Sequence, residues 1–245
     1  MRTLKLTLAY DGSGYAGWQR QENALAIQQV VEEAFAHFTG GKAPTISGAG
    51  RTDAGVHALG QVASVNVEFD HSASAVMRAL NVRLPDAIRA VGAVDAPTGF
   101  HARFNATGKS YRYRIQRTPV MSPFERLYGW HVPWSLDLDA MRAAAAALVG
   151  RHDFASFQAS GTKITETTRT LERLEIQESG SELLIHAEGD GFLRQMVRII
   201  AGTLVDVGSG QRDAASMPGV LAARNREAAG KTAPAHGLTL VAVRY

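Results

Sequence analysis

The residues most able to do chemistry lie in one short loop, Gly48 to His57, where glycines flank an aspartate that follows an arginine by two positions. Glycines permit the tight turns and close backbone approach that a reactive loop needs. A guanidinium, that of Arg51 or another, can keep the Asp53 carboxylate ionised for nucleophilic or general-base work at neutral pH. Asp53 could also simply cap a turn, and the residue types alone favour that role. We expect His57 to be a packed structural histidine.

A second candidate is a basic and aromatic segment, residues 103–117, which contains no acidic residue. Cations bind phosphate and rings stack on bases, so this composition suits RNA. On an extended strand the period of two places Arg112 and Arg114 on one face and Tyr111 and Tyr113 on the other. An ordinary amphipathic strand with core tyrosines is the alternative, and both remain open. The basic residues and rings are Arg103, Lys109, Arg112, Arg114 and Arg117, and Phe104, Tyr111 and Tyr113.

A third candidate is an arginine pair on a helix predicted over residues 192–207, where Arg194 and Arg198 stand one turn apart on the same side. Like charges at this spacing repel by a few tenths of a kcal/mol unless an anion lies between them. A carboxylate or a phosphate would supply that anion. A solvated helix face is the alternative.

Residues Gly12 to Gly17 match G-x-G-x-x-G after a strand, the pattern of a dinucleotide-binding loop. That motif opens a helix directly, whereas residues 18–23 intervene here, and the preceding strand alternates instead of being apolar throughout. We therefore expect no nucleotide cofactor, and a loop that presents Trp18 and Arg20 to a partner. The sequence also contains no HExxH, no P-loop and no His and carboxylate cluster at ligand spacing, so no metal is expected.

Composition narrows the class of protein. The chain has 245 residues, 45% of them apolar, enough for the core of one large or two modest domains. It has no cysteine, which excludes disulfides and thiolate sites and favours the cytoplasm. The longest apolar run, residues 143–149, is far shorter than the roughly 20 residues of a membrane span, so no membrane insertion is expected. Of 26 basic residues only five are lysine; this arginine bias suits phosphate, although a GC-rich genome produces it too.

Periodicity predicts a mixture of helices and strands. Strands separated by helices, with a hairpin turn at Ser179-Gly180, indicate an α+β fold with antiparallel sheets and helices on one side. The polar segment 105–108 is the predicted domain junction. Helices are expected over residues 27–38, 72–82, 137–148, 192–207 and 214–223. Strands are expected over residues 3–10, 61–69, 88–94, 110–116, 171–177, 182–188 and 238–243.

The loop Gly50-Arg51-Thr52-Asp53-Ala54-Gly55-Val56-His57-Ala58 strongly resembles the active-site loop of the tRNA pseudouridine(38-40) synthase family. Seven further segments are similar to the same family and follow in family order, so the resemblance covers nearly the whole chain. The segments 121–127 and 157–161 depart from the family pattern, the latter because relatives often carry a cysteine there. The similar segments are 10–12, 17–19, 100–104, 111–113, 152–154, 191–198, and 230–234 with 237–238.

The resemblance implies a fold of two ferredoxin-like (RRM-like) halves joined into one continuous antiparallel sheet, with helices packed on one side and an RNA-binding cleft between the halves. The first half would comprise residues 1–106 and carry the Asp53 loop, and residues 107–245 would complete the cleft. The resemblance further implies a homodimer across which one tRNA lies. No cofactor, metal or membrane is implied.

The same resemblance implies roles for individual residues. Asp53 becomes the catalytic aspartate, Tyr111 the ring that packs on the target base, Arg198 the basic partner of the aspartate, and Leu238 an apolar residue that lines the pocket. Asp53 would attack C1′ or C6 of the nucleotide or act as a base at C2′, which the sequence leaves open.

The implied reaction is the isomerisation of uridine to pseudouridine at positions 38, 39 and 40 of the anticodon stem-loop. Arg51, Arg112 and Arg194 are expected to bind the RNA. A non-catalytic RNA-binding protein with the same basic cleft is the alternative.

Overall fold

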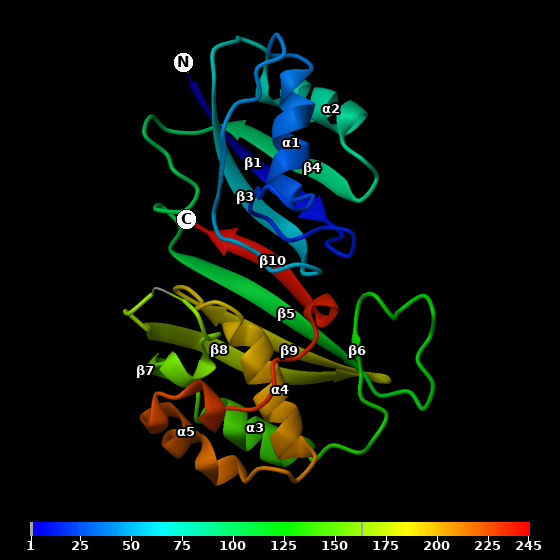
Figure 1. Cartoon of the computed structure of the whole chain (residues 1–245), viewed down its shortest axis with the longest axis vertical. Helices are drawn as coiled ribbons and strands as arrows, with labels where there is room; N and C mark the ends of the chain where they lie inside the picture. The colour runs from blue at the N-terminus through cyan, green and yellow to red at the C-terminus, as the bar shows by residue number, and fades with distance from the viewer. Residues whose placement is uncertain (1, 163) are drawn as a thin grey trace. The chain divides into compact units, whose positions relative to one another are not determined.

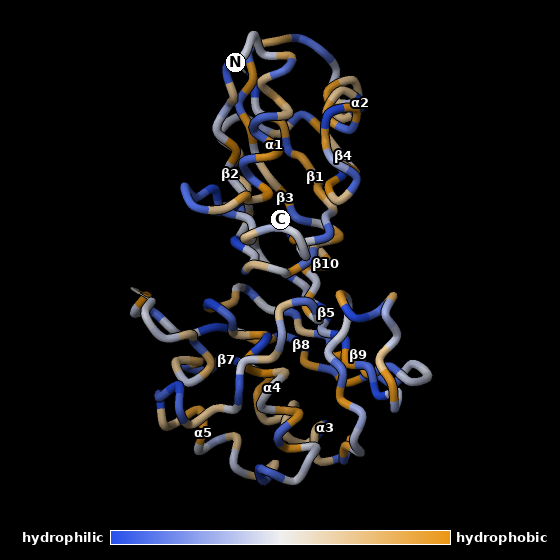
Figure 2. Tube along the Cα trace, turned by 45° about the vertical axis from the view of Figure 1, so that its right-hand side comes forward, coloured by the Kyte–Doolittle hydropathy of each residue, from blue (hydrophilic) through white to orange (hydrophobic). Residues whose placement is uncertain are grey.

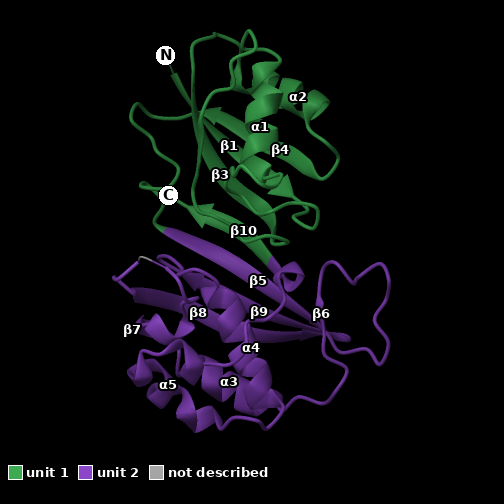
Figure 3. Ribbon diagram, in the orientation of Figure 1, with its two compact units in different colours: residues 1–107, 239–245 green, residues 108–238 purple. Residues whose placement is uncertain are grey.

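The computed structural model describes residues 2–162 and 164–245, which form two compact units (Figure 3). Unit 1 comprises residues 1–107 with 239–245, and unit 2 comprises residues 108–238. From the sequence, residues 107–245 were predicted to form the second half, whereas residues 239–245, in the last strand, belong to unit 1. The last strand was misplaced because the alternation of a strand shows which of its faces is buried but not which strand it pairs with.

Unit 1 is built on a sheet in the order β4-β1-β3-β10, with the short β2 paired to β3 (Figure 1). Pairing is antiparallel except that β10 runs parallel to β3, through Thr239 opposite His57 and Leu240 opposite Ala58. Leu4, Leu6 and Leu8 are fully buried on one face of β1, as its alternation predicts. The strands are β1 (Arg2–Tyr10), β2 (Ile46–Gly48), β3 (His57–Val67), β4 (Ile88–Asp95) and β10 (Leu238–Arg244).

Two helices, α1 (Ile27–Ala36) and α2 (Ala73–Arg83), cover this sheet and pack against each other (Figures 1 and 2). The buried face of α1 includes Ile27, Val31 and Phe35, spaced as the apolar stripe of an amphipathic helix. The Ser72 side chain caps α2 by accepting a hydrogen bond from the Ala75 amide at 3.3 Å.

Unit 2 holds a sheet in the order β5-β9-β8-β7, in which these neighbours pair antiparallel, and β6 pairs parallel to β5. The predicted hairpin joins β8 to β9, and Gly180 at its turn adopts a φ of 60°. Helix α3 packs against both α4 and β8. The elements are β5 (Gly108–Gln116), β6 (Trp130–His131), α3 (Leu138–Ala146), β7 (Gly150–Asp153), β8 (Thr168–Ser179), β9 (Glu182–Gly189), α4 (Met196–Gly208) and α5 (Met217–Ala223).

The predicted α+β class is therefore confirmed, but the sheets are mixed and largely antiparallel, not antiparallel throughout. Three strands, β2, β6 and β7, were not predicted; they have three, two and four residues, too few for alternation to be recognised. Within residues 2–162 and 164–245, no helix has the length and apolar character to cross a membrane.

The segment after α5 lies directly on α4 (Figure 1). A Cβ on Gly202 would stand 1.8 Å from the Lys231 carbonyl oxygen, so only glycine fits at this crossing. The Gly230 amide donates to Thr203 Oγ1 at 2.9 Å, and the Ala233 amide donates to the Arg198 carbonyl at 3.1 Å. The segment and the helix thus approach each other at main-chain distance, and side chains of the helix add further hydrogen bonds.

We predict that Gly202→Ala destabilises the protein by about 1–3 kcal/mol, because the added methyl forces the segment away from α4. Gly219→Ala in α5 is the control: its new Cβ meets nothing within 4 Å, and alanine favours a helix by up to about 1 kcal/mol. Urea unfolding of both variants measures the difference. Equal free energies of unfolding for Gly202→Ala and Gly219→Ala would contradict the close contact between Gly202 and Lys231.

Candidate active site

Asp53 opens a turn in the loop between β2 and β3. Its carbonyl accepts a hydrogen bond from the Val56 amide at 3.1 Å, and Gly55 has a φ of 77°. A type II turn requires positive φ at its third residue, which Gly55 provides. The main chain closes this turn. The Asp53 side chain is half-buried.

Two buried side chains hold the loop from inside unit 1. Tyr10 Oη shares a hydrogen bond with Thr52 Oγ1 at 2.9 Å, and Gln61 Nε2 donates to the Gly50 carbonyl at 2.9 Å and to Tyr10 Oη at 3.4 Å. Gln61 and Tyr10 are 0% and 4% exposed. Residues 50 and 52 are therefore tied inward, while Arg51 between them is exposed.

The glycine-rich segment 12–17 packs directly on the Asp53 loop. A Cβ on Gly12 would lie 2.0 Å from the Val56 oxygen, and one on Gly17, which has a φ of 91°, would lie 2.4 Å from the Thr52 oxygen. The Trp18 amide donates to that Thr52 oxygen at 3.1 Å. These glycines allow two loops to approach at backbone distance.

The expectation that Trp18 is presented to a partner is wrong. Trp18 is only 2% exposed, and a Cβ on Gly48 would lie 2.5 Å from its ring. Arg20 forms an ion pair with the buried Glu32 of α1 at 3.0 Å. Trp18 thus packs the loop against β2, whereas Arg20, whose side chain is still 49% exposed, connects the loop to α1.

His57 is a packed structural histidine, as predicted. It is 6% exposed, and its Nδ1 accepts a hydrogen bond from the Gly12 amide at 3.1 Å. The ring therefore fastens the glycine-rich segment to the first residue of β3.

A chain of side-chain hydrogen bonds connects Arg51 to α1. Arg51 Nε donates to Gln19 Oε1 at 3.1 Å, and Gln19 Nε2 donates to Gln28 Oε1 at 2.7 Å. Gln28 Nε2 in turn donates to Glu32 Oε1 at 2.9 Å. The guanidinium of an exposed arginine is thus oriented by a buried carboxylate three links away. Residue spacing in the sequence did not suggest this chain.

In unit 2, β5 has the predicted alternation, with Tyr111 and Tyr113 buried and Arg112 half-buried. The Tyr111 ring packs edge-on against Phe192, with centroids 5.0 Å apart and planes at 80°. Tyr113 is 0% exposed, and its hydroxyl donates to the Pro234 carbonyl at 2.8 Å. Burial raises the pKa of Tyr113 far above its ordinary value. Tyr113 is a core residue, whereas Tyr111 remains a candidate for contact with a base.

The predicted arginine pair on one helix face is wrong, because α4 begins at Met196 and Arg194 precedes it. Gln195, with a φ of 61°, reverses the chain before the helix, and a left-handed residue cannot be read from apolar spacing. Arg194 is exposed. Arg198 lies in the first turn of α4, where its Nε donates to the Ala233 carbonyl at 2.8 Å.

Leu238 is buried at the start of β10. The chain reaches it through the turn 235–237, where a Cβ on Gly237 would lie 2.6 Å from the Tyr113 ring. The next residue, Thr239, pairs with His57 of β3. Tyr113 and Phe192, which fix the surroundings of Leu238 and Tyr111, were not predicted as positioning residues.

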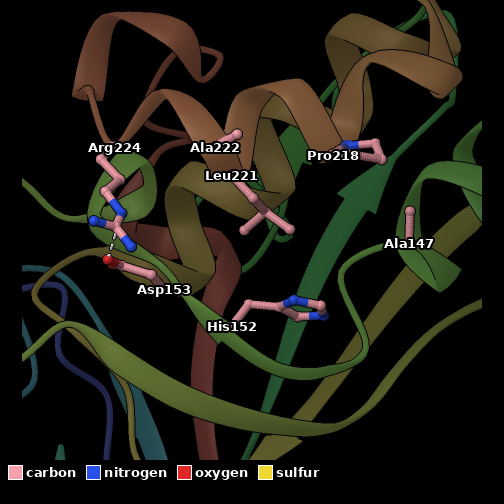
Figure 4. Close-up of a pocket in the computed structure, with 7 residues that line it drawn as sticks. All are labelled: Ala147, His152, Asp153, Pro218, Leu221, Ala222 and Arg224. Atoms are coloured by element: carbon pink, nitrogen blue, oxygen red, sulfur yellow. Dashed lines mark ion pairs between the residues drawn. The ribbon is translucent and has the colours of Figure 1, made fainter.

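A pocket of about 370 Å³ lies elsewhere in unit 2, and none of the predicted site residues lines it (Figure 4). Asp153 at its edge pairs with Arg224 Nε at 2.9 Å. A hydrogen bond from the Thr167 hydroxyl, assisted by the Ala155 amide and Arg224, lowers the pKa of Asp153. These bonds make Asp153 an anchor of the local fold. In the described part of the chain, no group of three or more His, Cys, Asp or Glu side chains could hold a metal ion.

Comparison with known proteins decides the family. A family model described as tRNA pseudouridine synthase matches residues 7–105 and 144–245, well over half of the chain. The chain belongs to this family. Curated relatives named tRNA pseudouridine synthase A include that of Syntrophotalea carbinolica, 47% identical over all of this chain and 97% of the relative. The enzyme of Acidiphilium cryptum is 46% identical over 100% of this chain and 97% of the relative, and that of Geobacter sulfurreducens 46% over 100% of each.

The comparisons confirm the predicted family. They also confirm the prediction that the protein is an isomerase. The residues matched by the tRNA pseudouridine synthase model include Arg51, Asp53, Arg194, Arg198 and Leu238. The matched ranges omit residues 106–143, where Tyr111 and Arg112 lie, while the alignments to the relatives span the whole chain.

We predict that Tyr10 makes the protein less stable at high pH. Burial raises the pKa of Tyr10 from 10.0 to about 12, opposed in part by its bonds to Thr52 and Gln61. Above pH 10 the unfolded chain loses this proton first, so stability is complete below pH 10 and falls as pH rises towards 12, by about 2 kcal/mol for this group.

Urea unfolding between pH 9 and 12 checks this prediction. The fall should be shallower in Tyr10→Phe than in the wild type, although Phe lowers stability at pH 9 by about 1 kcal/mol because the hydrogen bond to Thr52 is lost. Burial also raises the pKa of Tyr113 and Tyr245, so part of the fall persists in the variant. If the free energy of unfolding falls as steeply with pH in Tyr10→Phe as in the wild type, the raised pKa of Tyr10 does not cause the fall.

Proposed function

We propose that this protein isomerises uridine to pseudouridine in tRNA, at positions 38, 39 and 40 of the anticodon stem-loop, with Asp53 as its catalytic carboxylate. The match to the tRNA pseudouridine synthase family carries this proposal. The geometry of the loop supports it, since the main chain closes the turn that Asp53 opens, and buried Tyr10 and Gln61 hold Thr52 and Gly50 just before that turn. A carboxylate on such a support is oriented before a substrate arrives.

The reaction needs a carboxylate but no external reagent. The bond from N1 to C1′ of the uridine breaks and a bond from C1′ to C5 forms; C5 then loses its proton and N1 gains one from solvent. Asp53 acts as a nucleophile at C1′ or C6, or as a base at C2′. The base must leave its stack, at a cost of a few kcal/mol that an aromatic ring can partly offset.

Tyr111 is the proposed ring that packs on the displaced base, and Arg198 the cation that holds Asp53 ionised. In support, Phe192 fixes the Tyr111 ring edge-on, and the Ala233 carbonyl holds the Arg198 guanidinium at 2.8 Å. Charge-assisted pairing of Arg198 with a carboxylate would favour the ionised form. Leu238 is the proposed apolar lining of the pocket.

The proposal extends to the partner and the assembly. Arg51, Arg112 and Arg194 bind the RNA, with Arg51 held for this task by Gln19. Two ferredoxin-like halves would join their sheets beside an RNA cleft, and two copies of the chain would bind one tRNA in the cytoplasm. The reaction itself uses no cofactor.

We predict that Asp53→Asn lowers the rate of isomerisation by at least about 10³-fold, because the amide is neither a nucleophile nor a base. The variant should still bind tRNA, since the main chain forms the turn. Release of tritium from a tRNA transcript labelled at C5 of uridine measures the reaction directly. Asp86→Asn, a change of a fully exposed carboxylate in unit 1, is the matched control and should retain the wild-type rate.

Full activity of Asp53→Asn would overturn its catalytic role. A wild-type protein that binds tRNA but releases no tritium would instead be a non-catalytic RNA-binding protein.

Gln19 should influence activity chiefly through Arg51, because the bond from Gln28 to Glu32 remains when Gln19 is replaced. We predict that Gln19→Leu lowers the rate of tritium release in the wild-type background, because the Arg51 guanidinium loses its acceptor. The same substitution should not change the rate when Arg51 is already alanine. A double-mutant cycle on the tritium-release rate measures this coupling, expected at about 0.5–3 kcal/mol. Gln21→Leu on the same exposed segment is the control. Additive effects of Gln19→Leu and Arg51→Ala would show that the hydrogen bond between them is not used.

A further inference from the structure

The connection between β4 and β5 carries an aromatic and cationic turn that the proposed chemistry does not use. Phe104 is 77% exposed, which is unusual for a phenylalanine in an ordered turn. Arg103 beside it is also exposed, with its guanidinium carbon 5.8 Å from the centre of the Phe104 ring. His101 packs on the same ring, with centroids 4.4 Å apart and planes at 33°.

The turn is rigid because its own hydrogen bonds determine its shape. The His101 amide donates to Asn105 Oδ1 at 2.7 Å, and the Asn105 amide donates to the His101 carbonyl at 3.1 Å. His101 Nδ1 accepts from the amides of Arg103 and Phe104 at 3.1 and 3.4 Å. The exposed Phe104 ring is thus held in one place, and a ligand that contacts it does not have to order the turn.

The turn is also anchored to the base of the Asp53 loop. Ala102 is 0% exposed and forms a core cluster with Ala49, which lies in that loop, and Val62 of β3. The Ala102 amide donates to Ser64 Oγ at 3.1 Å, and its carbonyl accepts from the Tyr245 hydroxyl at 2.8 Å. An RNA that reaches Asp53 therefore meets a second fixed surface on the same unit.

We propose that Phe104, His101 and Arg103 form a stacking site for an unpaired base of the RNA substrate, distinct from the base on which Asp53 acts. An exposed ring with a guanidinium at its edge offers stacking to a base and a positive charge to the neighbouring phosphate. No acidic residue occurs between Asp95 and Glu125. The positive charge of this segment therefore favours a polyanion such as RNA over a basic protein as its partner. This inference rests on the proposed function for the identity of the RNA.

The test is the affinity for an unmodified tRNA transcript, measured as a function of salt. Phe104→Ala should raise the Kd by about 5- to 150-fold, the effect of removing one base-stacking ring, without changing the salt dependence. Phe104→Trp should bind as the wild type does, whereas Phe104→Leu, which keeps apolar volume but no π-face, should behave like alanine. Arg103→Ala should lower the slope of log K against log salt by about 1, because one phosphate contact is lost.

A fully paired RNA of the same length tests whether the base must be unpaired, and Phe104→Ala should bind it as tightly as the wild type does. Val82→Ala on α2 is the control, since Val82 is similarly exposed at 79% and has no cation or ring partner in the structure described. Three results would each overturn the stacking site. Phe104→Ala could bind tRNA with the wild-type Kd, it could lose as much affinity for paired RNA as for tRNA, or Phe104→Leu could bind tRNA with the wild-type Kd. A wild type without tritium release would instead refute the proposed function and leave this binding result standing.

Discussion

Close contact between two main-chain segments is the constraint on which the Asp53 loop depends. Residues 12–17 lie so near residues 52–56 that a methyl group on Gly12 or Gly17 would overlap a carbonyl oxygen. A backbone at this distance cannot slide without losing the bond from the Trp18 amide to Thr52. The glycine pattern that elsewhere surrounds a dinucleotide therefore has a different physical use here: it brings protein backbone, rather than a pyrophosphate, to the glycines.

The second unit uses the same device. Gly202 and Gly230 let the segment 230–233 lie against α4, and Gly237 lets the chain pass the Tyr113 ring. These glycines thus allow close approach to the backbone of α4 and to the Tyr113 ring within unit 2. β10 then pairs with β3 at His57 and Ala58, directly after the Asp53 loop, so the last strand borders the segment that carries the candidate catalytic residue.

Patterns with a period could be predicted from the sequence, and single-residue conformations could not. The alternation of β1 and β5, the apolar stripe of α1 and the β8–β9 hairpin follow from spacing and turn chemistry. The start of α4 was missed because Gln195 adopts a left-handed conformation, which no periodicity indicates. The parallel pairing of β10 was missed because a strand's pattern shows its buried face and not its neighbour.

The candidate site divides in the same way. Residue types alone left Asp53 as a turn residue, and only the resemblance of the whole loop to a known family assigned chemistry to it. Tyr111 and Tyr113 are indistinguishable by alternation, but the bond from Tyr113 to Pro234 identifies it as structural. Trp18 was predicted at a surface because it follows a glycine loop, whereas that loop turns the ring into the core.

Inward anchoring of alternate residues explains how the chain presents reactive side chains at its surface in fixed positions. In the Asp53 loop, Gly50 and Thr52 are tied to buried Gln61 and Tyr10, so the intervening Arg51 faces solvent. In the turn before β5, Ala102 is buried, while Arg103 after it is exposed and His101 before it is half-buried. Each outward group is then positioned by a hydrogen-bonded backbone on either side of it. Because the free energy for this order comes from folding, a substrate does not have to supply it on binding, and in the proposed reaction binding energy remains for displacing a base from its stack.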